Sequence, residues 1–271
     1  MKSQNKKYFT IILVLSFLFV AVFGLDKLTK RIPLSKDEAI LEVNFNADNY
    51  VIDFSELVFE YEVNYYTNER NLNKNDAFYQ FLLDAFINIE EVLADDASIY
   101  VFHADTEGFN FRKAFSDAGF YLSGCCIWKK DSLVLGRSPY QWQHEPVLFG
   151  WKKKGKHQWY TGRKETTIWE FDKPKKNGDH PTMKPIPLLA YPIMNSSMSN
   201  SVVLDPFGGS GSTLIACEQT DRICYTVELD EKFCDVIIKR YIEQVGTSKE
   251  VSVQRDGLSY GFDELELAAD E

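Results

Sequence analysis

The sequence predicts an α/β fold in which a mostly parallel sheet carries helices on both faces. Apolar residues recur at helical spacing over 77–93, and a short buried strand is expected directly after them at 98–104. Helix and strand patterns then alternate to residue 245, as in a parallel sheet with crossover helices. With 271 residues and 45% hydrophobic content, the chain can form one such domain with an appendage, and wholesale disorder is excluded.

The expected elements have ordinary lengths. Asp76 is a plausible N-cap for the first helix, and Gly119 ends the second. Helices are expected at 77–93, 109–120, 186–198, 212–220 and 231–245, and strands at 98–104, 122–130, 201–204 and 222–229.

The amino terminus differs from this body. Residues 1–7 are basic and residues 8–25 carry no charge, the pattern of an export signal or a membrane anchor. Residues 41–66 alternate like strands, and a polar break at 67–76 marks a boundary near residue 70. We therefore expect a leader (1–25), a β-rich segment of separate origin (26–70), a main domain (71–248) and an acidic tail (249–271).

A glycine-rich turn, VVLDPFGGSGSTLIACE at 202–218, follows a predicted strand and opens a helix. Such turns bind phosphates, dinucleotides or S-adenosylmethionine (SAM). A phosphate loop of the Walker type would need a lysine, which this stretch lacks, and the third glycine of a dinucleotide fingerprint is replaced by Leu214. Glu228, at the end of the next strand, is placed to accept hydrogen bonds from ribose hydroxyls.

Three segments then resemble the DNA amino-methyltransferases, which methylate adenine N6 or cytosine N4. DPFGGSGST resembles their SAM-binding motif, DHPTMKPIPLLAYPI (179–193) their second SAM-binding element, and VELDEKFCDVIIKRY (227–241) their ribose-binding strand and following helix. The order of these motifs is like that of the β subgroup, and the resemblance covers about residues 76–245. It implies a Rossmann-like class I methyltransferase sheet, SAM as cofactor and a place in a restriction-modification system.

The resemblance also implies roles for single residues. Thr182 and Lys184 would bind the SAM carboxylate or the adjoining backbone, and Glu228 the ribose; a solvated surface lysine is the alternative for Lys184. The residues that would surround the methionine part and the sulfonium are Asp205, Phe207, Gly208, Gly209 and Gly211.

A basic, aromatic segment precedes the second motif. Residues 128–184 hold all five tryptophans and thirteen Lys or Arg against six Asp or Glu, although the chain as a whole has a net charge of -10. In the family this stretch, about 129–178, is an inserted target-recognition region; a compact β-rich insertion that buries its tryptophans is the alternative. His144 and Glu145 are taken as structural. The candidate DNA-binding residues are Lys152, Lys153, Lys154, Lys156 and Arg163.

The family's catalytic tetrad, [DNS]PP[YFW], is missing from its expected place before the helix at 77–93, and no Pro-Pro pair occurs in the chain. Glu60 and Tyr61 are weak candidates for its position. Three functions remain open: a working or impaired DNA methyltransferase, an inactive SAM- or DNA-binding remnant, and a membrane-tethered interaction protein. The five cysteines lack the paired spacing of a zinc site, so no metal is expected.

The expected partners follow from these alternatives. They are double-stranded DNA, a second copy in a homodimer, and a membrane contacted through residues 8–25. The expected location is the cytoplasm by function, with anchoring by the apolar segment.

Overall fold

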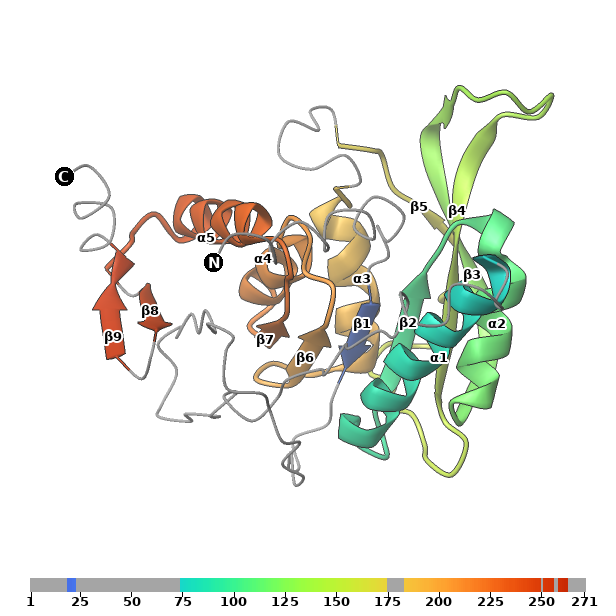
Figure 1. Cartoon of the computed structure of the whole chain (residues 1–271), viewed down its shortest axis with the longest axis horizontal. Helices are drawn as coiled ribbons and strands as arrows, with labels where there is room; N and C mark the ends of the chain where they lie inside the picture. Colours follow the sequence, from blue (N-terminus) through green and yellow to red (C-terminus); the bar gives the residue numbers. More distant parts are fainter. Residues whose placement is uncertain (1–18, 23–73, 175–182, 250, 256–257, 263–271) are drawn as a thin grey trace, which may run out of the picture.

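The computed structural model describes residues 19–22, 74–174, 183–249, 251–255 and 258–262. A seven-stranded sheet in the order β5-β3-β4-β2-β1-β6-β7 forms its centre (Figure 1). Its strands are β1 (Phe19–Val22), β2 (Ser98–Phe102), β3 (Phe120–Val134), β4 (Trp142–Lys152), β5 (Ile168–Glu170), β6 (Val202–Asp205) and β7 (Ile223–Thr226). Its helices are α1 (Lys74–Val92), α2 (Gly108–Asp117), α3 (Ile186–Ser196), α4 (Ser212–Gln219) and α5 (Glu231–Val245).

The sheet is mixed rather than mostly parallel. β6 pairs with β7 in parallel and β3 with β5 in parallel, whereas β4 runs antiparallel to both β2 and β3. β1 lies between β2 and β6 and is antiparallel to both, so β2 and β6 point in the same direction. The carboxyl ends of β2, β6 and β7 therefore lie along one edge of the sheet, which we call the carboxyl edge.

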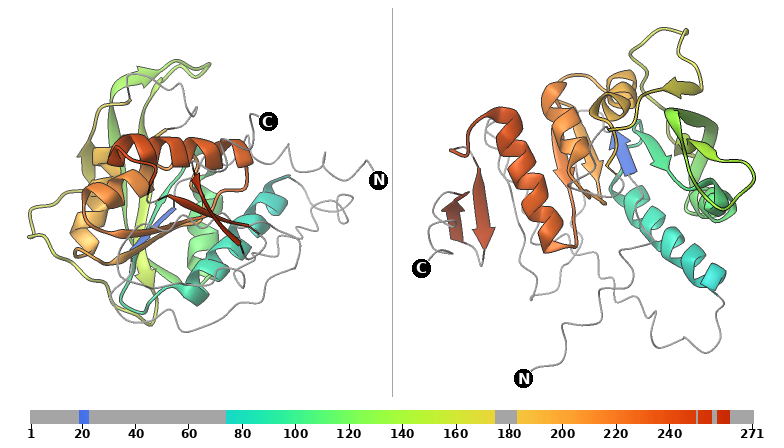
Figure 2. Two further views of the ribbon diagram at one scale, coloured as in Figure 1. Left: turned by 90° about the vertical axis from the view of Figure 1, so that its left-hand side faces the viewer. Right: turned by 90° about the horizontal axis from the view of Figure 1, so that it is seen from above.

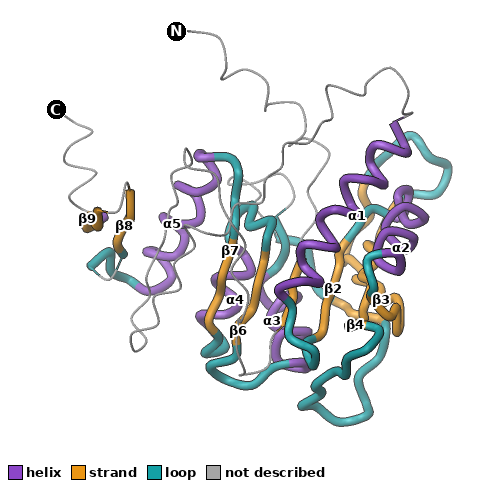
Figure 3. The backbone as a smooth tube through the Cα atoms, turned by 60° about the horizontal axis from the view of Figure 1, so that its bottom comes forward, coloured by secondary structure: helices purple, strands orange, loops and turns teal. Residues whose placement is uncertain are grey.

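Helices cover both faces of the sheet, as the sequence predicts (Figures 2 and 3). α1 and α2 pack against one face through a core that includes Phe86, Phe115 and Val101. α3 and α4 pack against the other face, where Tyr100 and Leu188 are buried, and α5 packs beside α4. These two buried layers hold the strand ends that carry the candidate site.

β1 corrects one expectation from the sequence. Phe19–Val22 belong to the apolar stretch 8–25, expected to be an anchor or export signal, and they form a strand inside the sheet instead. Among the described residues no helix combines the length and apolar character needed to span a bilayer. The rest of 8–25 lies outside the described residues, as does the predicted β-rich segment 26–70.

The basic, aromatic segment also differs from a separate insertion. β4, β5 and the end of β3 are strands of the main sheet, so the stretch 129–178 contributes strands to the central fold. Trp128 and Trp169 are buried at 3% and 5% exposure and cannot stack on a nucleic-acid base. Their apolar rings fill the core beneath α3, which is why this stretch joins the sheet.

The expected acidic tail, 249–271, contains a second small sheet. β8 (Ser252–Arg255) and β9 (Leu258–Gly261) form an antiparallel hairpin (Figure 1). Val251, beside this hairpin, is buried together with Ile237 and Tyr241 of α5. The acidic residues from 263 onward lie outside the described part of the chain.

Candidate cofactor site

The glycine-rich turn joins the end of β6 to α4 at the carboxyl edge. Its backbone is tied to the neighbouring β7 strand, because Val227 N–H donates to Asp205 O at 3.0 Å and Gly208 N–H donates to Val227 O at 2.8 Å. Gly209 and Gly211 have φ angles of +56° and +75°, values that disfavour residues with a Cβ. The turn therefore needs glycine for its backbone path.

Gly208 is required for a different reason, namely close approach. A Cβ at this position would collide with the Thr226 hydroxyl and would lie 3.3 Å from Val227 O. The bare glycine lets β6 and β7 stay adjacent where the turn begins. The sequence predicted this turn from local spacing alone, and its geometry agrees.

Glu228 links the turn to the end of β7. Its carboxylate accepts hydrogen bonds from Gly209 N–H at 2.6 Å and from Asp230 N–H at 3.0 Å. Burial raises the pKa of Glu228, and the backbone N–H groups of Asp230, Gly209 and Leu229 oppose that effect. Each carboxylate oxygen thus accepts one backbone hydrogen bond and keeps a lone pair for another donor.

Asp205 is the most deeply buried ionisable group of the site, with no exposed surface. Its Oδ1 accepts the Phe207 N–H at 3.1 Å, while Oδ2 has no partner of hydrogen-bond geometry among the described residues. Burial raises the pKa of Asp205 to about 7, although the Phe207 N–H and the nearby Thr213 hydroxyl favour the ionised form. A buried, unsatisfied carboxylate oxygen fits a cationic donor from a ligand.

Arg240 of α5 binds the glycine-rich turn, and it was not among the residues predicted from the sequence. Its guanidinium donates to Ser210 O and, at 3.4 Å, to the Ser212 hydroxyl. Arg240 lies on α5, thirty residues after Ser210. The signal that would reveal it is an arginine at helical spacing on the apolar face of α5, beside Ile237 and Tyr241.

Lys184 is neither a surface lysine nor free to move. Only 6% of its side chain is exposed, and its Nζ lies 2.7 Å from Glu145 Oε1. Its ammonium also faces the rings of Phe102 and Trp128, at 5.5 and 5.9 Å from their centroids. Thr182, the other residue assigned to the SAM carboxylate, lies outside the described residues.

Glu145 joins two lysines in one buried group. Lys130 Nζ lies 3.3 Å from its second oxygen, Oε2. Burial raises the pKa of Glu145, but the ammonium groups of Lys184 and Lys130 outweigh burial and hold it below its ordinary value. Glu145 is thus ionised and structural, as the sequence suggested for it.

The predicted DNA-binding lysines lie away from this edge. Lys152 pairs with Glu90 at 3.7 Å and Asp95 at 3.5 Å, and Lys156 N–H donates to Asp95 O. Asp95 precedes β2, so these residues lie where β2 begins, at the opposite edge from the glycine turn. The structure therefore does not bring Lys152, Lys153, Lys154 and Lys156 together with the cofactor site. Arg163 is exposed in the loop between β4 and β5.

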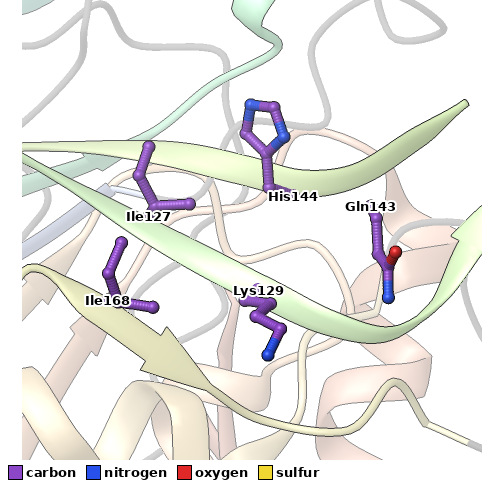
Figure 4. Close-up of a pocket in the computed structure, with 5 residues that line it drawn as sticks. All are labelled: Ile127, Lys129, Gln143, His144 and Ile168. Carbon is purple, nitrogen blue, oxygen red and sulfur yellow. The ribbon is translucent and has the colours of Figure 1, made fainter. Parts of the chain in front are cut away.

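A hollow of about 430 Å³ lies over the outer strands of the sheet (Figure 4). Ile127 and Ile168 supply apolar walls, and Lys129, Gln143 and His144 supply polar groups. These side chains come from β3, β4 and β5, and they lie beyond the end of β2, because Ile127 pairs with Pro146 while Phe102 pairs with Val147. The hollow is therefore at the carboxyl edge.

The missing tetrad was expected directly before α1, so the strand that would lead into it bears on the sheet position next to β2. The chain runs from α1 into β2. A strand that preceded α1 would therefore form a strand–helix–strand unit with β2, and a right-handed crossover would place it beside β2 and parallel to it. That position is held by β1, which runs antiparallel. Glu60 and Tyr61, the weak candidates, lie outside the described residues.

Comparison with known proteins points in one direction. A family model described as "DNA methylase" matches residues 61–240. The type II methyltransferase M2.MboI of Moraxella bovis is 24% identical over 221 residues, which are 75% of this chain and 81% of that protein. The type II methyltransferase M.SmaI of Serratia marcescens is 26% identical over 52% of this chain, which spans only 53% of that relative's length.

Solved structures agree in fold. The crystal structure of an M1.HpyAVI–SAM complex superposes with a TM-score of 0.54 at 23% identity, over 60% of this chain and 82% of that one. The PvuII cytosine-N4-specific DNA methyltransferase superposes with a TM-score of 0.55 at 17% identity, over 63% of this chain and 72% of that one. The expected Rossmann-like methyltransferase sheet is thereby confirmed.

Proposed function

Because the chain belongs to the DNA methylase family whose model matches residues 61–240, we propose that it transfers a methyl group from SAM to an exocyclic amine of adenine or cytosine in DNA. The observation that carries the proposal is the buried Asp205 carboxylate with an unsatisfied Oδ2 beside a glycine turn. A phosphate would be repelled by this group, whereas the α-ammonium of SAM would satisfy it. The same argument separates SAM from the phosphate ligands of similar turns.

The other residues that the family resemblance assigns to the cofactor support the same ligand. Glu228, fixed by the Gly209 and Asp230 N–H groups, has one lone pair on each oxygen for the two ribose hydroxyls. Gly208 and Gly211 keep the turn free of side chains at its closest approach to β7 and α5, and Gly209 has a positive φ. Phe207 is assigned to the methionine part with them. These residues bind and orient the cofactor.

The role of Lys184 differs from the direct binding of the SAM carboxylate that the family resemblance implies. Glu145 holds the Lys184 ammonium in place. From that position the positive charge of Lys184 attracts the SAM carboxylate. The same charge acts to lower the pKa of Asp205, against the larger effect of burial. Thr182 remains assigned to the SAM carboxylate by the motif. The prolines around Lys184 start α3 at Ile186, with Pro185 as N-cap, and this fixes the lysine at the carboxyl edge.

SAM supplies an electrophilic methyl group when it is bound. During transfer a C–N bond forms to the base amine, the S–C bond breaks, and the amine loses one proton. Two proposed roles remain for Glu60 and Tyr61: the carboxylate accepts the amine hydrogens, and the ring stacks on the base displaced from the duplex. The family match begins at Tyr61, so this residue lies at the start of the matched segment of the sequence.

A second candidate function is a module that binds SAM or DNA without methyl transfer. It is favoured by the absence of a Pro-Pro pair from the sequence and by the antiparallel β1 beside β2. The proposed DNA substrate puts the active protein in the cytoplasm. Homodimer formation and membrane contact through residues 8–25 are not part of the proposal, since no described residue supports either.

Two measurements test the proposal on the full chain. Calorimetric titration with SAM is expected to show one site, which Gly209→Asp removes by placing a carboxylate and a Cβ at a residue with φ of +56°. Transfer of labelled methyl groups from SAM to unmethylated duplex DNA then separates the two candidates. Binding without transfer supports the inactive module, and absence of SAM binding contradicts the methyltransferase and leaves only a module that binds DNA.

A further inference from the structure

A buried histidine lies at the carboxyl edge, outside the residues assigned to the cofactor. His103 directly follows the last residue of β2, and only 1% of its surface is exposed. Its backbone N–H donates to Pro146 O at 3.1 Å, which ties the end of β2 to β4. Residues 104–106, which come next, are exposed. The imidazole therefore lies just below the surface of the edge that carries the glycine-rich turn.

The hydrogen bond of the imidazole determines its tautomer. Nδ1 of His103 lies 2.9 Å from the Ala104 carbonyl oxygen, and because a carbonyl can only accept, Nδ1 carries the hydrogen. In the neutral ring Nε2 is then an acceptor with a free lone pair. Nε2 is buried, and it has no hydrogen-bond partner among the described residues. A buried acceptor without a partner is costly to the fold, and it suits a ligand that brings a hydrogen-bond donor.

The ring is neutral at physiological pH. Burial lowers the pKa of His103, and this effect exceeds the opposing effect of the Ala104 hydrogen bond. The charged groups that face the ring are Arg112 of α2, which also lowers this pKa, and Asp105 and Glu145, which raise it. A neutral imidazole of this kind can take up a proton during a reaction and return it to water afterwards.

The imidazole points to the face of the sheet that α1 and α2 cover (Figure 3). Ile99 and Val101 of β2 are buried in the core of that face, and His103 continues the alternation. Its ring stacks on Phe111 of α2, with centroids 4.9 Å apart and planes at 15°. Phe111 in turn contacts Phe78, near the start of α1, at 5.9 Å between centroids. Two ring contacts thus connect His103 to the start of α1, which the segment expected to hold the tetrad would enter.

The same part of α1 also contacts the glycine-rich turn. Phe81, three residues after Phe78, packs against Phe207 with ring centroids 6.5 Å apart. Phe207 is assigned to the methionine part of SAM, so α1 joins the neighbourhood of the methyl donor to that of His103. The ionised Asp205 carboxylate suits the α-ammonium of the cofactor, whereas a neutral imidazole suits a neutral amine. The donor that fits Nε2 is therefore the exocyclic amine of the base.

We propose that Nε2 of His103 accepts a hydrogen bond from the exocyclic amine of the target base and takes up the proton that this amine loses. The amine has two hydrogens, and Glu60 is the proposed acceptor for the other one. As the new C–N bond forms, one N–H bond breaks and its electron pair stays on the base nitrogen. The proton moves to Nε2 and then to water. This inference deepens the proposed function and rests on it.

The kinetic test uses the full chain, saturating SAM and unmethylated duplex DNA. His103→Phe keeps a ring stacked on Phe111 but removes the acceptor, and it is expected to lower kcat by about 100-fold or more. Because this variant also removes a buried atom without a partner, its thermal midpoint should be equal to that of the parent or higher. His103→Gln offers an amide oxygen near the position of Nε2 and is expected to recover part of the rate.

The pH dependence separates proton uptake from a simple hydrogen bond. At saturating SAM, which removes the effect of Asp205 on cofactor binding, kcat of the parent should fall as pH drops below about 6.5 and through the lowered pKa of His103. Glutamine does not titrate, so His103→Gln should lose this fall. SAM affinity, measured by calorimetry, should be the same in the parent and in both variants.

A second readout does not depend on methyl transfer. Nitrogen NMR of the imidazole in the parent chain follows Nε2 while deoxyadenosine or deoxycytidine is added together with S-adenosylhomocysteine, the cofactor without its methyl group. The nucleoside that the protein accepts should shift the Nε2 signal as its amine donates a hydrogen bond. The same nucleosides with dimethylated amines have no hydrogen to donate, and they should leave the signal in place.

The outcomes are separable. Methyl transfer by the parent together with a full rate in His103→Phe overturns the inference and leaves the proposed function in place. A loss of SAM affinity that matches the loss of rate in both variants shows that His103 acts through the fold, and it overturns the inference as well. An Nε2 signal that moves equally with the dimethylated nucleosides contradicts the hydrogen bond. A parent chain that binds SAM and transfers no methyl group removes the proposed function, and the inference with it.

Discussion

The backbone N–H of Gly209 donates a hydrogen bond of 2.6 Å to the carboxylate of Glu228, nineteen residues further along the chain. This bond joins the turn after β6 to the residue that follows β7, so the two halves of the candidate cofactor site are held by direct contact. The second oxygen of Glu228 accepts Asp230 N–H and thereby connects the site to the start of α5.

Glu228→Gln is expected to weaken SAM binding at least about tenfold, because an amide has one acceptor oxygen where the carboxylate has two. The measurement is calorimetric titration at constant pH. Glu231→Gln, a neighbouring exposed carboxylate in the first turn of α5, is the matched control. Equal losses in the two variants would show that only general charge matters at this end of the site.

Gly208→Ala is expected to abolish SAM binding and lower the thermal midpoint, since the new methyl group collides with the Thr226 hydroxyl. Gly124→Ala provides the comparison, because a Cβ at Gly124 meets no atom within 4 Å. Thermal unfolding followed by circular dichroism, with and without SAM, measures both effects. Unchanged SAM affinity in Gly208→Ala would contradict the close approach of β6 and β7.

Asp205→Asn is expected to stabilise the SAM-free protein at about pH 8 and to leave it unchanged at about pH 4. The pKa of Asp205 is raised to about 7, so the free energy of unfolding of the parent falls as pH rises from its unfolded pKa toward 7. The amide carries no charge and escapes this loss, at about 1.4 kcal/mol for each pKa unit. Chemical denaturation at the two pH values measures the difference.

The same substitution is expected to weaken SAM binding, because an amide cannot neutralise the α-ammonium. In the parent protein, SAM affinity should rise between about pH 6 and pH 7.5 as Asp205 ionises. Asp205→Asn should lose this rise. A pH-independent affinity in the parent would show that Asp205 does not contact the charged end of the ligand.

Glu145→Gln is expected to lower the free energy of unfolding by about 3 kcal/mol at neutral pH, because it leaves the Lys184 ammonium buried without its partner. The pKa of Glu145 is depressed, so its contribution is present above its unfolded pKa and is lost as pH falls through its folded pKa. The difference between variant and parent should therefore shrink in acid.

Glu170→Gln is the control for this ion pair. Glu170 pairs with Lys129 at 2.6 Å, but both side chains are more than half exposed, and such pairs contribute less than about 1 kcal/mol. Urea titrations of both variants measure the contrast. Similar small losses in the two would mean that water reaches the Lys184–Glu145 pair.

Patterns that depend on neighbouring residues were readable in the sequence. The helix predicted at 231–245 is α5 residue for residue, because its apolar spacing is regular and Asp230 caps it by accepting Lys232 N–H. The glycine turn was equally accessible, since its positive φ angles and the acid after β7 are encoded within about 25 residues.

Contacts between distant segments were not readable. Lys184 pairs with Glu145, and no local pattern selects a partner from another strand. The lysines at 152–156 were assigned to DNA by charge, but β4 is antiparallel and returns the chain to the far edge of the sheet. β1 was missed because four residues of an apolar run fit a strand as well as a longer membrane segment.

The position of β1 in the sheet also determines when, during synthesis, the sheet can be completed. Ala21 pairs with Leu204 and Val22 with Val203, so one edge of this strand pairs with residues more than 180 positions further along the chain. At a synthesis rate of about 5–20 residues per second, roughly 10–40 s pass between the emergence of the two partners. During that interval β1 can pair with β2, which follows it by about 80 residues, while its other edge has no partner strand. The seven-stranded sheet can therefore be completed at β1 only after β6 has been synthesised.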